Sequence, residues 1–219
     1  MSEKKLIIIG ASDFGREIMY AAKDCKFGNE KICWKTVAFV DEAEDKIGTL
    51  LEELPIISFN ELSEIMDDET FLIIGVGNAV SREKLYRKLK EIIPESKFTS
   101  IIHRSAVIMP NTVIKEGVFI APNTTIAIGT NIKEHVVVNQ NVSIGHDCVL
   151  NEFSVVSPGS ILSGHTKVGK KSFLGSGVIS YPNVTIGDNC TVSSGVVVIR
   201  NLKTNNKQIL KPNTMILPS

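Results

Sequence analysis

The chain has 219 residues, with 24 Lys and Arg against 24 Asp and Glu, so its formal net charge is zero. A neutral chain argues against an extended nucleic-acid footprint, which needs clustered, unpaired basic side chains. No apolar run approaches the length of a membrane span, and residues 6–9 are too short for a signal-peptide core. The four cysteines form no C-x-x-C pair and no dense disulfide framework, so we expect a reduced, cytoplasmic protein.

Charge is concentrated in the first half of the chain. Residues 1–104 carry 34 of the 48 charged side chains, whereas residues 105–200 carry 11. Aromatic residues also become sparse after residue 104. Because helices carry most of the surface charge of globular proteins, the charge-poor segment is not expected to be helical. We therefore predict two domains, residues 1–102 and residues 103–219.

The first domain alternates between strands and helices. The apolar run at residues 6–10 is typical of a buried parallel strand, and residues 36–41 and 70–75 predict two more strands. Residues 14–23 have apolar side chains at four-residue spacing, which predicts a helix. Asn78 is suited to cap a later helix and Pro94 to end it. This alternation predicts a small Rossmann-like α/β domain with a parallel sheet.

From Ser105 onward the sequence repeats every six residues. In 16 consecutive blocks the fourth residue is Ile, Leu or Val in 15, and only Ser180 departs from this rule. The second residue is always Ala, Ser, Thr, Cys or Val. A period of six matches neither an amphipathic helix nor the two-residue alternation of a strand. It predicts a parallel β-helix with 18 residues per coil, a core of aliphatic fourth residues and a cap at residues 201–219.

Several segments together resemble one known family. They are residues 10–15 (GASDFG), 40–42, 74–75, 102–103, 143–148 (SIGHDC) and 156–159. This combination is similar to the NeuD/PglD-type sugar O- and N-acyltransferases, whose repeats form a left-handed β-helix. The resemblance implies acetyl-CoA as co-substrate and acetyl transfer to an amino or hydroxyl group of a sugar. It also implies a homotrimer with active sites between adjacent β-helices.

The same resemblance places the catalytic residues at His146 and Asp147. Acyl transfer needs a base that takes a proton as the acceptor attacks the thioester, and histidine is suited to this at neutral pH. Asp147 is expected to orient the ring of His146. The alternative interpretation is a solvent-exposed corner histidine without a catalytic role.

The 18-residue coil predicts the neighbours of this pair. Asp147 and His165 are 18 residues apart, so they are expected to stack about 4.8 Å apart on adjacent coils. His146 stacks in the same way on Gly164, which leaves room for the thioester and offers a backbone N–H to the oxyanion. For His165 we expect structural support, with competition for Asp147 as the alternative. His135 is expected to be a corner residue.

The remaining site residues are implied by the resemblance. CoA is bound in the family mostly by backbone groups along the groove between two subunits, and the N-terminal domain holds a nucleotide sugar. A tight strand-to-helix turn without a ligand is the alternative interpretation of residues 10–15. The expected CoA-binding residues are Val155, Gly164, Ser176 and Ser194, and the expected sugar-nucleotide residues are Ser12, Asp13, Phe14, Asp41, Glu42 and Gly75.

The four histidines show no zinc-site pattern. Some β-helix proteins are zinc carbonic anhydrases, in which three histidines hold the metal and two of these are five residues apart. The gaps here are 32, 11 and 19 residues, so we expect no catalytic metal.

The sequence therefore predicts an acetyl-CoA-dependent acetyltransferase. Its predicted acceptor is the amino group of a nucleotide-linked sugar, with a UDP-linked 4-amino-6-deoxy sugar preferred. Two alternatives stay open: O-acetylation of sialic acid or another glycan hydroxyl, and a non-catalytic β-helix trimer.

Overall fold

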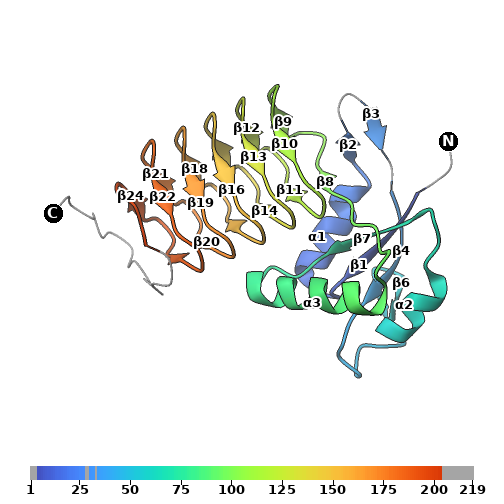
Figure 1. Ribbon diagram of the computed structural model, residues 1–219. Helices are drawn as coiled ribbons and strands as arrows, with labels where there is room; N and C mark the ends of the chain where they lie inside the picture. The colour runs from blue at the N-terminus through green and yellow to red at the C-terminus, as the bar shows by residue number, and fades with distance from the viewer. Residues whose placement is uncertain (1–3, 28–29, 33, 204–219) are drawn as a thin grey trace. The chain divides into compact units, whose positions relative to one another are not determined.

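The chain divides into two compact units, Met1–Arg104 and Ser105–Ser219 (Figure 1). The computed structural model describes residues 4–27, 30–32 and 34–203. Cys33 and most of the predicted cap, residues 204–219, lie outside the described residues. Within the described ranges, none of the helices has the length and apolar character needed to cross a membrane.

A largely parallel sheet forms the middle of the first unit, with the strand order β5-β6-β4-β1-β7. Only the β5–β6 pair of this sheet is antiparallel, and β2 pairs with β3 in a separate antiparallel two-stranded sheet. The elements are β1 (Lys5–Ile9), α1 (Asp13–Ala22), β2 (Cys25–Phe27), β3 (Glu30–Ile32), β4 (Lys35–Val40), β5 (Leu50–Leu51), β6 (Leu54–Ile57), α2 (Phe59–Ile65), β7 (Thr70–Ile74), α3 (Ala79–Ile92) and β8 (Ile101–Ile102).

Local sequence explains where the helices of this unit begin. The side chain of Ser12 caps α1 by accepting a hydrogen bond from the Gly15 amide, and Asn78 caps α3 in the same way. The predicted strands and helices are confirmed to within a residue or two of their ends. Helix α2 was not predicted, although Ser58 and Glu61 form a capping box at its start.

The second unit is a stack of two-residue strands spaced six residues apart (Figure 1). The strands are β9 (Val107–Ile108), β10 (Val113–Ile114), β11 (Phe119–Ile120), β12 (Thr125–Ile126), β13 (Asn131–Ile132), β14 (Val137–Val138), β15 (Ser143–Ile144), β16 (Val149–Leu150), β17 (Val155–Val156), β18 (Ile161–Leu162), β19 (Lys167–Val168), β20 (Phe173–Leu174), β21 (Ile179–Ser180), β22 (Thr185–Ile186), β23 (Thr191–Val192) and β24 (Val197–Val198).

Every third strand joins the same parallel sheet. We name the sheets by their first strand in this unit: the β9 sheet (β9, β12, β15, β18, β21, β24), the β10 sheet (β10, β13, β16, β19, β22) and the β11 sheet (β11, β14, β17, β20, β23). Pairing is in register one coil apart, so Ile126 faces Ile144 and Ile144 faces Leu162. The predicted parallel β-helix of 18-residue coils is thereby confirmed.

Each place in the six-residue repeat has a distinct structural role. Fourth-place side chains such as Ile144 and Leu162 are almost completely buried and fill the coil. Second-place side chains such as Cys148 are also buried, inside the corner. First-place residues make the turn itself: Asp147 and His165 have φ of 55° and 58°. Asn, Asp and Gly tolerate this left-handed conformation best, which explains their frequency at the first place.

His135 differs from its prediction as a simple corner residue. It does occupy a corner with φ of 56°, but its side chain is 1% exposed. The ring stacks on Phe153 of the next coil, with centroids 5.0 Å apart. Gly117, on the preceding coil, leaves the space for this ring, because a Cβ at that position would overlap it.

Replacing a fourth-place residue should destabilise the coil. Leu150 is fully buried between β13 and β19, so Leu150→Ala is expected to lower the free energy of unfolding by about 2–5 kcal/mol. Urea denaturation at constant protein concentration measures the loss. Lys167→Ala on the adjacent strand removes an exposed side chain and should change little. Equal effects of the two substitutions would contradict the inward role of the fourth place.

Candidate functional site

His146 and Asp147 form a hydrogen-bonded pair at the corner that follows β15. His146 Nδ1 lies 2.9 Å from Asp147 Oδ2. The backbone on both sides of His146 is held by adjacent coils, because the Gly145 amide donates to Leu162 O and the Asp147 amide to Ile128 O. Both side chains remain about half exposed. The corner thus presents an imidazole whose Nδ1 is occupied by a carboxylate and whose Nε2 faces away from that carboxylate.

Two glycines on adjacent coils leave room for the pair. A Cβ at Gly164 would lie 2.6 Å from His146 Nε2, and a Cβ at Gly129 would overlap Asp147 Oδ1. Side chains at these positions would displace the ring or the carboxylate. The predicted stacking of His146 on Gly164 is therefore what the structure shows.

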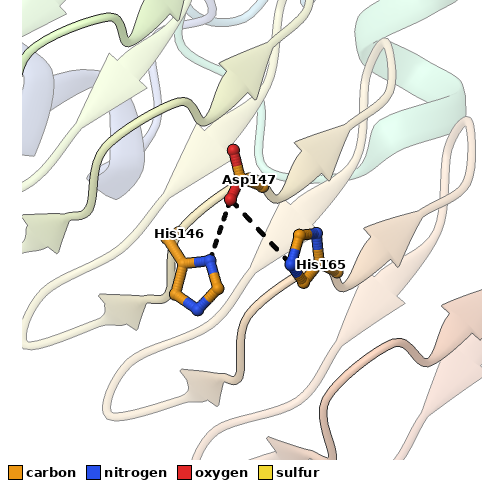
Figure 2. A group of neighbouring side chains, drawn as sticks. All are labelled: His146, Asp147 and His165. Carbon is orange, nitrogen blue, oxygen red and sulfur yellow. Dashed lines mark hydrogen bonds and ion pairs between the residues drawn. The ribbon is translucent and has the colours of Figure 1, made fainter.

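A second imidazole shares the same carboxylate. His165 Nε2 lies 3.9 Å from Asp147 Oδ2, and its ring meets that of His146 edge to face with centroids 4.9 Å apart. Figure 2 shows Asp147 between the two rings, with a nitrogen of each directed toward it. Sequence spacing correctly predicted that His165 and Asp147 are neighbours.

Cys148 follows the pair in sequence but points into the coil. Burial is the main reason that the pKa of its thiol is raised to about 11. Its Sγ donates to the carbonyl of Ser163 at 3.3 Å. A buried, protonated thiol is not a nucleophile at neutral pH, so covalent catalysis by Cys148 is excluded as an interpretation of this corner.

The structure separates the predicted CoA-binding residues. Gly164 lies beside His146, whereas Ser176 and Ser194 are exposed at the corner between the β11 and β9 sheets. His146 lies at the next corner, between the β9 and β10 sheets. Val155 is 3% exposed within β17. One coil stack therefore does not bring Ser176 or Ser194 to His146.

Ser12, one of the predicted sugar-nucleotide residues, holds the turn between β1 and α1. Ser12 accepts from the Gly15 amide and donates to Gly75 O at 2.9 Å. Asp13 is exposed on the first turn of α1, and Phe14 is half-buried.

Asp41 has most of its hydrogen-bonding capacity in use. Its carboxylate accepts from the amides of Ala11, Glu42 and Ala43 and from Lys46 Nζ. Burial alone would raise the pKa of Asp41, but the backbone hydrogen bonds together with Lys46 outweigh it and lower the pKa. Asp41 is therefore an ionised residue that fastens the loop after β4.

A cavity of about 260 Å³ lies at the carboxyl ends of β1 and β4, beside the start of α3. Asp41 and Glu42 line it, whereas the other predicted substrate residues do not. Ser81 and Lys84, which sequence reasoning missed, also line it. Asn78 could have predicted the position of Ser81, because a helix capped at Asn78 has Ser81 in its first turn. The other lining residues are Ile9, Gly10, Val40, Phe59, Val76 and Leu85.

Comparison with known proteins agrees with both units. Residues 5–89 match the PglD N-terminal domain, and residues 165–200 match the bacterial transferase hexapeptide repeat. A similar solved structure is a histidine-to-asparagine mutant of perosamine N-acetyltransferase from Caulobacter crescentus, in complex with CoA and GDP-perosamine. It is 26% identical with a TM-score of 0.82, over 92% of this chain and 91% of that chain. Both matches are those of the NeuD/PglD-type family of sugar acyltransferases, which this chain resembles over nearly its whole length.

Two further solved structures are similar to this chain over most of its length. The acetyltransferase domain of PglB from Neisseria gonorrhoeae is 26% identical with a TM-score of 0.77, over 91% of this chain and 93% of that chain. WeeI from Acinetobacter baumannii shares the fold, at 23% identity and a TM-score of 0.79, over 91% and 93% of the two chains. The predicted fold class is confirmed as an α/β domain followed by a parallel β-helix. The left-handed winding is what the resemblance to the family implies.

Adding one carbon atom at Gly164 tests the geometry of the corner. Gly164→Ala is expected to push the His146 ring from its place, because the new Cβ would approach Nε2 to 2.6 Å. The imidazole resonances of His146 in a two-dimensional NMR spectrum should shift. Ser163→Ala changes the preceding residue without adding an atom and should leave them in place. Unchanged His146 resonances in Gly164→Ala would contradict the stacking.

Proposed function

We propose that the protein transfers an acetyl group from acetyl-CoA to the amino group of a nucleotide-linked sugar, with His146 as the general base. The His146–Asp147 pair beside Gly164 carries this proposal, because it combines an imidazole oriented by a carboxylate with a neighbouring glycine whose missing side chain leaves room for the ring. Acetyl-CoA is proposed as the acyl donor because the similar PglB acetyltransferase domain has been solved in complex with acetyl coenzyme A.

The proposed reaction proceeds by direct transfer. The neutral amine of the sugar attacks the thioester carbonyl, and a C–N bond forms as Nε2 of His146 takes the amine proton. Asp147 Oδ2 accepts the hydrogen bond from Nδ1–H and stabilises the imidazolium. The backbone N–H of Gly164 donates to the oxyanion. The C–S bond then breaks, and the CoA thiolate leaves and recovers the proton from Nε2.

The cavity of the first unit is the proposed nucleotide site. It lies at the carboxyl ends of parallel strands, where α/β sheets commonly bind nucleotides. Lys84 supplies a cation and Ser81 a hydroxyl group to its lining, which suits a diphosphate. The carboxylates of Asp41 and Glu42 on the same lining are paired with Lys46 and Lys88. A UDP-linked 4-amino-6-deoxy sugar is the preferred substrate from the sequence. Two similar structures hold GDP-perosamine, so a GDP-linked amino sugar is the alternative substrate to test beside it.

The active enzyme is proposed to be a homotrimer. Ser176 and Ser194 lie on a different corner from His146, so they contribute to CoA binding only if a neighbouring β-helix presents them. We propose that the reaction takes place in the cytoplasm. The buried free thiols of Cys25, Cys148 and Cys190 agree with a reducing compartment.

Removing the base should abolish chemistry and spare binding. His146→Asn is expected to lower kcat by about 10²–10⁴-fold, the usual contribution of a general base, while the Kd for acetyl-CoA stays unchanged. Thiol release from acetyl-CoA measures kcat across UDP- and GDP-linked 4-amino sugars and free sialic acid. His103→Asn, in the first unit, is the matched control. Release of CoA at the wild-type rate by His146→Asn would refute the assignment, and absence of acetyl-CoA binding by the wild type would favour a scaffold.

Removing the cavity cation should weaken binding of the nucleotide sugar. Lys84→Ala is expected to raise its Kd by about tenfold or more, because a hydrogen bond to a charged group contributes about 1.5–3 kcal/mol. The acceptor-saturated kcat should stay near the wild-type value. Lys90→Ala, on the same helix and outside the cavity lining, should leave Kd unchanged. Equal affinity of Lys84→Ala and wild type would place the nucleotide elsewhere.

A further inference from the structure

The corner holds one more ligand-forming group than acyl transfer uses. His146, Asp147 and His165 each offer a donor atom, and these atoms lie within 4.8 Å of one another. In the described part of the chain, they are the one group of three histidine, cysteine or acidic residues with this proximity. The catalytic proposal needs only His146 and Asp147, so His165 has no part in it.

The three donors match the chemistry of a transition-metal site. Two imidazole nitrogens and one carboxylate oxygen form a common zinc donor set, with bonds of about 2.0–2.2 Å. The backbone is held in place, since the His165 amide donates to His146 O at 2.9 Å. All three side chains are about half exposed, so they have freedom to rotate onto an ion. Water would complete a tetrahedral shell on the solvent side.

We propose that His146, Asp147 and His165 form an inhibitory binding site for Zn²⁺ or a similar divalent transition-metal ion. The inhibition rests on the proposed function. A metal bound at His146 Nδ1 takes the place of the proton there, so the neutral ring carries its proton on Nε2. An Nε2–H group cannot accept the proton of the attacking amine. The ion would thus block the base without entering the acyl-transfer reaction.

Metal binding is measured on the full-length protein without acetyl-CoA or sugar. Zn²⁺ titration by calorimetry should give one ion per chain, and Co²⁺ should develop visible absorption bands at the same stoichiometry. Loss of a residue that only supports a metal ligand lowers metal affinity by about 10–100-fold. His165→Asn removes a ligand itself, so the Zn²⁺ affinity of this variant should fall at least as much. His103→Asn is the matched control, because its Nε2 also lies 3.9 Å from an aspartate, Asp24, outside this cluster.

The outcomes of the binding experiment do not depend on the transferase reaction. Equal Zn²⁺ affinity of His165→Asn and wild type, or no ion bound to the wild type, would overturn the site. Inhibition is then compared with each variant's own metal-free rate. Zn²⁺ should slow acetyl transfer by the wild type more than by His165→Asn. Binding without inhibition would overturn the assignment of Nδ1 as a ligand.

A second inference comes from Ser180, the one polar residue at the fourth place. In the β9 sheet, fifth-place amides donate to the fourth-place carbonyl of the next coil, as Ala127 does to Ile144 O and Gly145 to Leu162 O. The Ser163 amide instead donates to the hydroxyl group of Ser180 at 3.1 Å. Strands β18 and β21 keep their register, with Leu162 opposite Ser180, but the amide immediately before Gly164 is bound by a side chain.

The hydroxyl group of Ser180 closes a ring of hydrogen bonds. Thr166 Oγ1 donates to Ser163 O at 2.6 Å, so the 2.7 Å contact between Ser180 Oγ and Thr166 Oγ1 has Ser180 as its donor. Ser180 and Thr166 are fully buried. The ring spans Ser163 to Thr166, which are the residues on either side of Gly164 and His165. Buried networks with every member satisfied are rigid.

We infer that Ser180 is a positioning residue that sets the Gly164–His165 corner for acyl transfer. An aliphatic residue at position 180 would return the Ser163 amide to the regular ladder and move Gly164 relative to His146. The effect on rate rests on the proposed function, whereas the effect on the corner does not.

Substitution of Ser180 separates positioning from stability. Ser180→Val restores the aliphatic column, so the free energy of unfolding should equal or exceed that of the wild type. Its His146 resonances should nevertheless shift and kcat should fall by about tenfold or more, with the Kd for the nucleotide sugar unchanged. Ser180→Thr keeps a hydroxyl group and should retain most of the activity. If Ser180→Val does not fold, Ser180→Ala is tested in the same way. Unchanged His146 resonances and kcat in a folded variant would overturn the inference.

Discussion

In-register stacking of identical places in successive coils is the constraint on which the second unit depends. Each fourth-place aliphatic side chain packs between its equivalents one coil before and one coil after. A slip of one residue would turn every inward side chain toward solvent, so the register is strongly specified. Residues 18 positions apart in the sequence are therefore neighbours on adjacent coils.

The geometry of the proposed active site is a consequence of this register. Position 146 has Gly164 as its neighbour on the next coil, and position 147 has Gly129 and His165 on either side. The left-handed backbone at Asp147 belongs to the ordinary corner of the repeat. The proposed base and its carboxylate thus require no special loop. They occupy two consecutive corner places, and small residues on adjacent coils provide the room.

Much of this arrangement was predictable because it is periodic. The six-residue period predicted the coil, and the 18-residue separation predicted that Gly164 lies beside His146 and His165 beside Asp147. The features that sequence reasoning missed are those without a period. The saturation of Asp41 by three amides and Lys46 depends on the loop after β4, and the contribution of Ser81 and Lys84 depends on where α3 begins. Ser180 was visible only as a break in the pattern, since its bonds to Ser163 and Thr166 are three-dimensional.

The central claim is that His146 and Asp147 act as one unit on this corner, and a double-mutant cycle on kcat tests it most directly. The cycle compares His146→Asn, Asp147→Asn and the double variant in acetyl transfer from acetyl-CoA to a nucleotide-linked amino sugar. Residues that act as a unit are strongly non-additive. We expect the double variant to be no slower than His146→Asn alone. A double variant slowed by the product of the two single effects would contradict the claim.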